Sequence, residues 1–338
     1  ATTAPAVAAP PTIRLGDPYG STDKVAITVD PVTAGIDLVQ LNIHDYAETV
    51  ARKQPFTFME WSPGTPRPFS TLSVSITAPG AAPIDYNLYG TQAVWKVLSQ
   101  SPTTLTLGLR LGDAQNHPLI ALTKTFTINP ATYDVNVSHQ VQNLSDHPLT
   151  VAINQVAAID LPRDNIQGDD RSYDGATLDV AKKIITAPVD LQFHTGLTKF
   201  AGSAHEMGAF SGSTPLLWTA ASNRFFVAIT RPQPTPSAAA SFQFTLEDGR
   251  KIELTNHVAS ASLDAYVLPS AAGLPAGTTP DLLAVIRFSG AAMKIDPGAS
   301  IDMPLTSYLG PKQRTILAGD RTAAVGTDAY NYEIYQYY

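Results

Sequence analysis

The feature that most constrains the fold is a hydrophobic period of two residues, which recurs in segments along most of the chain. Residues 104–111 read TLTLGLRL, with leucine at every second position. Residues 119–128 and 133–141 repeat the alternation on either side of a short turn that contains Pro130. Successive side chains of a β-strand point to opposite faces of its sheet. The pattern therefore predicts half-buried strands joined by hairpins.

Similar patterns continue towards the C-terminus. They occur at residues 216–220, 224–230, 241–246, 261–268, 282–288 and 301–309. More than a dozen strands are predicted, and the high content of proline (27) and glycine (22) suits the turns between them. The sequence predicts an all-β, mostly antiparallel fold of two packed sheets, with a short helix after Pro311 near the C-terminus.

Composition excludes several classes of protein. The net charge is -7, which disfavours a nucleic-acid-binding protein because such proteins need a basic face. There are no cysteines, so disulfide scaffolds, thiolate zinc sites and cysteine nucleophiles are excluded. No apolar run approaches the length of a membrane-spanning helix. Hydrophobic residues make up 44% of the chain, enough for a sizeable core.

The chain divides into three parts. Residues 1–22 begin with ATTAPAVAAPP and are predicted to form a flexible tether. Residues 23–320 carry the strand patterns and are predicted to form the folded domain. Residues 321–338 form a tyrosine-rich C-terminal segment. Within the domain, residues 160–175 are polar and rich in turn-forming residues, so we predict a long surface loop there.

Five sequence blocks follow one another in a fixed order. They are DKVAITVDPVTAGIDLVQLNIHDY at 23–46, QPFTFMEWSP at 54–63, LTKTFTINPATYDVNVSHQVQNLSDHPLTV at 122–151, LLWTAASNRFFVAITRP at 216–232 and LTSYLGPK at 305–312. In sequence and order these blocks resemble the large periplasmic domain of the YidC/Oxa family of bacterial membrane protein insertases. The opening block departs from the family, which usually has a Gly-Gly pair where this chain has Ala34-Gly35.

The resemblance implies a β-supersandwich, the two-sheet architecture of galactose mutarotase-like domains. It also implies a non-catalytic extracytoplasmic domain, without a cofactor, on the periplasmic side of the bacterial inner membrane. Its expected partners are accessory subunits of the Sec translocon and nascent membrane proteins, with membrane attachment through flanking segments. The family's insertion groove lies among transmembrane helices, so none of its residues can be assigned here.

Lys124 and His139 are candidate binding residues. Both are in phase with the apolar side chains of their strand patterns. One interpretation is a cationic group that faces a ligand in a cleft. The other is a lysine at a sheet edge whose ammonium reaches water, beside a hydrogen-bonded core histidine. We favour the second interpretation.

The tyrosines near the C-terminus are the other candidate binding residues. Tyr330, Tyr332 and Tyr335 lie among five tyrosines in the last nine residues. Tyrosine favours the boundary between water and lipid, because its ring is apolar and its tip polar. We predict that this segment leads towards a membrane. The alternative is a tail whose rings pack on the sandwich.

Metal and catalytic sites are weakly indicated. Five aspartates lie in residues 160–174, but their spacing does not match a calcium-binding EF-hand loop. His205-Glu206 would suit sugar acid–base chemistry only if the two groups converged, whereas neighbouring strand residues diverge. A carbohydrate-active enzyme or a carbohydrate-binding protein, with Trp61, Trp95 or Trp218 as a stacking platform, remains the alternative function. Core packing is the favoured role for these tryptophans.

Overall fold

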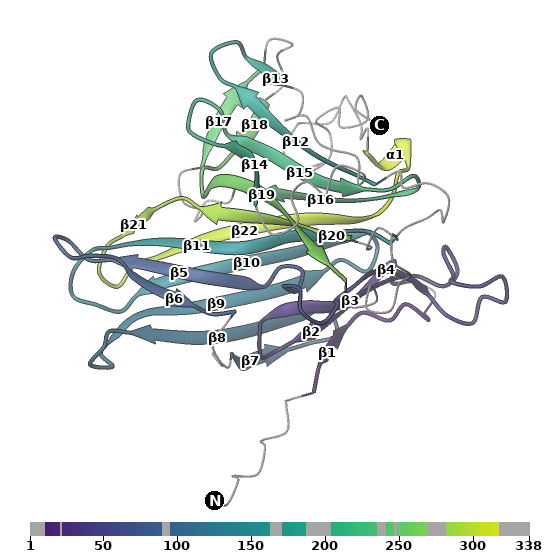
Figure 1. Cartoon of the computed structure of the whole chain (residues 1–338), viewed down its shortest axis with the longest axis horizontal. Helices are drawn as coiled ribbons and strands as arrows, with labels where there is room; N and C mark the ends of the chain where they lie inside the picture. Colours follow the sequence, from purple (N-terminus) through teal and green to yellow (C-terminus); the bar gives the residue numbers. More distant parts are fainter. Residues whose placement is uncertain are drawn as a thin grey trace, which may run out of the picture.

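The computed structural model describes residues 11–20, 22–89, 95–162, 171–186, 204–234, 241–246, 249, 251–268 and 282–317. Its strands form two large sheets that face each other, together with two smaller sheets (Figure 1). The larger facing sheet has nine strands, and every pairing within it is antiparallel. In spatial order they are β13 (Ile184–Thr186), β12 (Ser172–Asp179), β15 (Leu216–Ser222), β16 (Phe226–Pro232), β22 (Ser300–Pro311), β10 (Asp134–Asn143), β9 (Pro118–Ile128), β8 (Thr104–Gly112) and β7 (Lys96–Gln100).

The second large sheet has seven strands. In order they are β14 (His205–Ala209), β19 (Val258–Val267), β20 (Leu282–Gly290), β11 (Leu149–Ile159), β5 (Thr71–Thr77) and β6 (Ile84–Asn87), and β21 (Met293–Ile295) pairs separately with β11. Apolar side chains from both sheets meet between them, among them Leu107 and Phe126 of the nine-stranded sheet and Val74 of the seven-stranded sheet. The predicted antiparallel two-sheet architecture is therefore confirmed at the level of the main sandwich.

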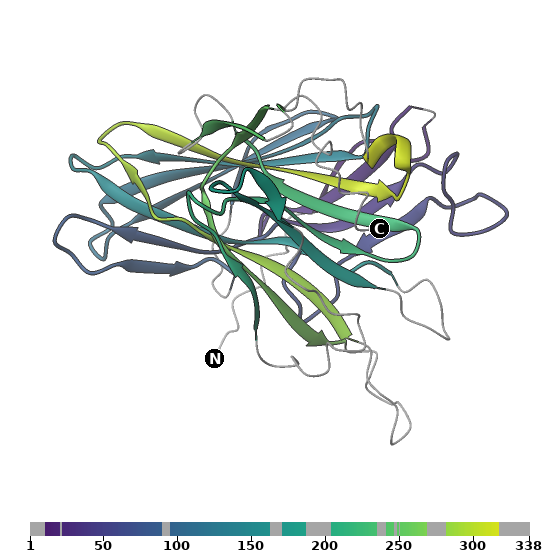
Figure 2. The ribbon, with the colours of Figure 1, turned by 90° about the horizontal axis from the view of Figure 1, so that it is seen from above.

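Two smaller sheets add to the sandwich. One contains β1 (Ile13–Leu15), β2 (Val25–Asp30), β3 (Gly35–Leu41) and β4 (Phe56–Glu60), and the other β17 (Phe242–Thr245) and β18 (Lys251–Leu254). The predicted C-terminal helix is a single turn, α1 (Arg314–Leu317). Figure 2 shows α1 and the four-stranded sheet, drawn in purple, towards the same end of the molecule.

Two predicted boundaries are wrong. The tether was expected to extend to residue 22, but Ile13–Leu15 already pairs with β2 as strand β1. Leu15 is fully buried, which explains why this short segment is held in the fold. The predicted surface loop at 160–175 is also wrong at both ends. Asp160 and Arg171 are buried, and β12 begins at Ser172.

The last strand of the described residues, β22, occupies a central position in the nine-stranded sheet. Tyr308 of β22 pairs with Asp134 of β10 on one side and with Ile229 of β16 on the other. β22 therefore joins the strands β13, β12, β15 and β16 to the strands β10, β9, β8 and β7.

Candidate functional site

The two candidate residues in the middle of the chain form part of a buried polar cluster. Lys124 of β9 and His139 of β10 are direct cross-strand partners, and both residues are fully buried. The hydroxyl of Thr71, at the start of β5, lies 3.1 Å from Lys124 Nζ and 2.8 Å from His139 Nε2. Lys124 Nζ also donates to the carbonyl of Phe69. This central cluster links the two large sheets through side chains.

Burial lowers the pKa values of the two ionisable side chains in the central cluster, Lys124 and His139. It holds the pKa of the Lys124 amine well below its usual range. Burial also lowers the pKa of His139, and the neighbouring Lys124 and His257 lower it further. Burial therefore disfavours the charged form of both groups. Inside the sandwich, the central cluster joins Lys124 and His139 to the Thr71 hydroxyl, and Lys124 also to the Phe69 carbonyl.

The expected placement of Lys124 is wrong, whereas that of His139 as a hydrogen-bonded core histidine is right. Lys124 does not sit at a sheet edge, because β9 lies between β8 and β10, and its amine does not reach water. Neither residue lines the pocket described below. Their binding role remains a prediction. Tyr330, Tyr332 and Tyr335 lie outside the described residues, so their role also remains a prediction.

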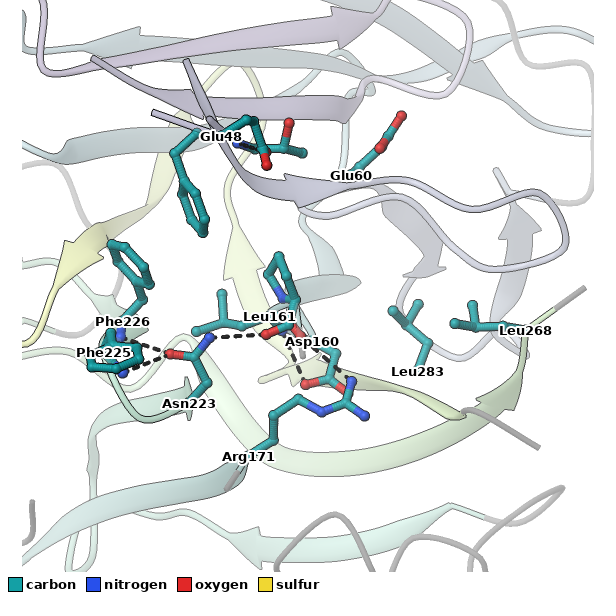
Figure 3. Close-up of a pocket in the computed structure, with 13 residues that line it drawn as sticks. Glu48, Glu60, Asp160, Leu161, Arg171, Asn223, Phe225, Phe226, Leu268 and Leu283 are labelled. Carbon is teal, nitrogen blue, oxygen red and sulfur yellow. Dashed lines mark hydrogen bonds and ion pairs between the residues drawn. The ribbon is translucent and has the colours of Figure 1, made fainter. Parts of the chain in front are cut away.

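A pocket of about 570 Å³ opens at the end of the sandwich and is here called the end pocket (Figure 3). β4 and the chain before it supply one wall, the turn between β15 and β16 another, and the ends of β19 and β20 a third. Its lining residues are Glu48, Phe56, Thr57, Glu60, Asp160, Leu161, Pro162, Arg171, Asn223, Phe225, Phe226, Leu268 and Leu283.

A buried ion pair lies on one side of the end pocket. Arg171 Nη1 donates to Asp160 Oδ2 at 2.9 Å, and both side chains are almost fully buried. The same carboxylate oxygen accepts from the Tyr173 hydroxyl at 2.7 Å and from the Ala284 N–H at 3.1 Å. The Leu161 N–H donates to the other oxygen. These contacts compensate the two buried charges, and this part of the pocket is held in place.

The aromatic wall of the end pocket is equally well held. The rings of Phe56 and Phe226 stack with centroids 4.6 Å apart. Asn223 Oδ1 accepts from the N–H groups of Phe225 and Phe226, and its Nδ2 donates to the Pro162 carbonyl at 2.9 Å (Figure 3). The Asn223 side chain thus fixes the turn that presents both phenylalanines.

Two carboxylates lie on the opposite wall from the ion pair (Figure 3). Glu48 accepts a hydrogen bond from the Thr57 N–H at 2.6 Å, and Glu60 is exposed at the end of β4. The pocket therefore combines phenylalanine and leucine walls with acidic groups. This chemistry suits an apolar side chain that has a basic neighbour.

The sequence interpretation missed the end pocket. Its residues come from segments far apart in the chain, and no local spacing brings Glu60, Asp160 and Phe225 together. One signal was available, because the Phe225-Phe226 pair follows Asn223 and Arg224 in a turn. Such a turn exposes one of two neighbouring large apolar residues.

The remaining candidates are accounted for by the fold. His205 and Glu206 are consecutive on β14, so their side chains leave opposite faces of the strand, as predicted. Trp95 and Trp218 are buried in the core, which confirms their predicted role. Trp61 is only half-buried, and the guanidinium of Arg67 lies 3.8 Å from its ring centroid.

The acidic stretch after β11 gives no metal site in the part that is described. The Asp160 carboxylate is engaged by Arg171. No group of three or more histidine or acidic side chains within the described ranges is arranged to hold a metal ion. The described helix is too short to cross a membrane.

Comparison with known proteins identifies the family. The family model of the YidC periplasmic domain matches residues 21–332, which is nearly the whole chain. This chain belongs to the YidC periplasmic domain family. The match includes both large sheets, the end pocket and the central cluster.

A curated relative of the YidC periplasmic domain supports the assignment. The chain is 24% identical over 294 residues to the membrane protein insertase YidC of Marinomonas sp. (strain MWYL1). The alignment covers 86% of this chain but 44% of the relative. The chain therefore spans less than half the length of that protein.

Solved structures show the fold of this YidC periplasmic domain. A galactose mutarotase related enzyme from Lactobacillus acidophilus aligns with a TM-score of 0.54 at 10% identity, covering 89% of this chain and 97% of the enzyme. A galactose mutarotase-like protein from Lactobacillus casei ATCC 334 aligns with a TM-score of 0.50 at 9% identity, covering 88% and 99%. Identities this low establish the common architecture alone.

Proposed function

We propose that this chain is a non-catalytic extracytoplasmic domain of a membrane protein insertase, on the periplasmic side of the bacterial inner membrane. It would assist insertion and folding through contacts with accessory subunits of the Sec translocon or with segments of nascent membrane proteins. The observation that carries the proposal is membership of the YidC periplasmic domain family over residues 21–332.

The chemistry of the end pocket supports a binding role. Phe56, Phe225 and Leu283 offer apolar contact, and the carboxylates of Glu48 and Glu60 offer charge to a basic group. Segments that enter a membrane are apolar and often have lysine or arginine at their ends. Such a segment matches both features of the pocket.

A role without catalysis is supported by the composition of the same pocket. A mutarotase-type reaction needs a general acid and a general base on opposite sides of a sugar ring. The described lining contains carboxylates but no histidine. His139 is fully buried in the central cluster, where a sugar has no access. These features favour a binding surface over a carbohydrate-active site.

The first test measures binding to a labelled peptide of about 20 apolar residues with a lysine at each end. Fluorescence anisotropy should show saturable binding. Glu60→Lys should weaken it about fivefold, because it places a like charge beside the lysine-flanked segment. Glu206→Lys is the matched control, since Glu206 is also exposed but lies on β14. Equal binding by the two variants would exclude the end pocket as the peptide site.

The second test addresses partners and the alternative function. The chain is immobilised and exposed to purified extracytoplasmic domains of Sec accessory subunits, where specific retention is expected. Failure to retain these domains, together with failure to bind the peptide, would overturn the proposal.

Polarimetry with galactose checks catalysis, and acceleration of anomer exchange by the chain would overturn the non-catalytic assignment.

A further inference from the structure

Two loops at one end of the sandwich expose large apolar side chains. Val50 lies in the connection between β3 and β4, and its exposed fraction is 103%. Phe225 lies in the turn between β15 and β16, and it is 55% exposed. Most large apolar residues of the described chain are at least partly buried, so two such tips at one end require an explanation.

The two loops are neighbours in space. The ring of Tyr46, at the base of the first loop, lies 5.4 Å from the ring of Phe226, which follows the second tip. Gln313, beside α1, donates from its side chain to the Tyr46 hydroxyl at 3.4 Å. In Figure 1 the purple loops beside β3 and β4 and the helix α1 lie towards the same end of the molecule. Val50 and Phe225 therefore project from neighbouring loops, and the two residues are here called the apolar tips.

The backbone fixes the first loop in place. Ala47 and Pro55 form an isolated β-bridge at its base, and the Arg52 N–H donates to the Thr49 carbonyl at 2.9 Å. Val50 sits within the turn that this second bond closes. The loop is thus built to present Val50 away from the sheets.

Basic side chains flank both apolar tips. Arg52 and Lys53 follow Val50 and are exposed, and neither has a carboxylate partner among the described residues. Arg224 precedes Phe225, with its guanidinium 5.3 Å from the Phe225 ring centroid. The acidic groups nearest these tips pair with other residues or line the end pocket. Asp45 pairs with Lys24 at 3.1 Å, and Glu48 accepts from the Thr57 N–H.

We propose that the apolar tips dock on the surface of a membrane that contains anionic lipids. Val50 and Phe225 would enter the interfacial layer while Arg52 and Lys53 contact lipid phosphates. The charge argument is local, because the whole chain carries a net charge of -7 and is repelled by such a surface elsewhere. The combination of exposed apolar groups with adjacent cations is that of interfacial membrane binding. This proposal rests on the proposed location at the membrane.

The first experiment is cosedimentation with vesicles of phosphatidylcholine, with and without phosphatidylglycerol. We expect binding that requires the anionic lipid and weakens in about 0.5 M salt. Arg52→Ser with Lys53→Ser should lower the vesicle partition coefficient more than tenfold, at roughly fivefold for each charge. Val50→Ser with Phe225→Ser should lower it about tenfold.

The matched control removes equally exposed apolar groups elsewhere. Val97 and Leu98 on the edge strand β7 are 48% and 59% exposed. Val97→Ser with Leu98→Ser should leave vesicle binding unchanged. If this control lowers binding as much as the tip variant, or if the tip variant binds like the original chain, the proposal is overturned.

A site-specific measurement separates docking from any effect on folding. The chain has no cysteine, so a single introduced cysteine can be labelled uniquely. An environment-sensitive dye attached through Val50→Cys should shift to shorter wavelength on adding anionic vesicles, whereas one attached through Val97→Cys should not. No shift at position 50, or the same shift at both positions, would overturn the proposal. Either outcome would leave the peptide and Sec-binding tests of the proposed function unaffected.

Discussion

Lys124 Nζ and the hydroxyl of Thr71 lie 3.1 Å apart in the interior between the two large sheets. A fully buried lysine must lose either its proton or its hydration when the chain folds. The contacts of the central cluster make this residue a source of pH-dependent stability.

Lys124→Met should remove that dependence. Burial lowers the pKa of Lys124 well below 10.5, so between the two values the unfolded chain binds one more proton than the folded chain. The free energy of unfolding therefore rises with pH across this window, by up to about 1.4 kcal/mol per pH unit. Urea unfolding between about pH 7 and about pH 9 should show a shallower rise for the variant. Lys294→Met, at a side chain 71% exposed, is the control, and equal slopes in all three proteins would contradict the prediction.

His257 should make the fold sensitive to acid. Burial lowers its pKa from 6.5 to about 4, so the unfolded chain binds more protons between these values. Stability is lost as the pH falls through this window, by up to about 1.4 kcal/mol per pH unit. His257→Gln should flatten the pH dependence of urea unfolding there. His117→Gln, at a side chain 76% exposed, serves for comparison, and the prediction fails if the two variants behave alike.

Arg171→Met should destabilise the fold by about 3–5 kcal/mol, because it leaves the Asp160 carboxylate buried without its cation. Combining it with Asp160→Leu should restore part of the loss, since no charge then remains buried. The measurement is the free energy of unfolding from denaturant titration. A loss below about 1 kcal/mol for the single variant would show that the pair is not needed.

Replacing the three tail tyrosines tests the prediction for the C-terminal segment. Tyr330→Ser, Tyr332→Ser and Tyr335→Ser together should lower partition into phosphatidylcholine vesicles, because each ring favours the interface. Cosedimentation measures the effect. Tyr19→Ser, at an exposed tyrosine of the folded domain, is the control. Unchanged partition of the triple variant would favour packing of the tail on the sandwich.

The strands were predictable because their signal is local. Leu122, Lys124 and Phe126 share one face of β9, as the alternation indicates. The neighbours of a strand are set by distant segments, so the sequence pattern did not reveal that β9 has a partner on both sides. The prediction of a sheet-edge lysine failed for that reason. The Asp160–Arg171 pair escaped notice likewise, because polar residues near turns usually remain hydrated.

The candidate site was less predictable than the fold. The end pocket depends on side chains from β4, β20, the chain between β11 and β12 and the turn before β16, which only the packing of the sheets brings together. Family resemblance indicated the class of protein. It did not indicate which surface offers apolar and acidic groups.

The central position of β22 has a consequence for folding during synthesis. Ser300–Pro311 joins the two halves of the nine-stranded sheet, and it is the last strand in the described chain. A chain that emerges from its N-terminus can form the β8–β9–β10 meander early, but the sheet cannot close until residue 311 is available. During that interval β10 and β16 each have an open edge that is prone to non-native pairing. Both edges are covered only once β22 has paired with β10 and β16, which is when the residues that follow β22 begin to emerge.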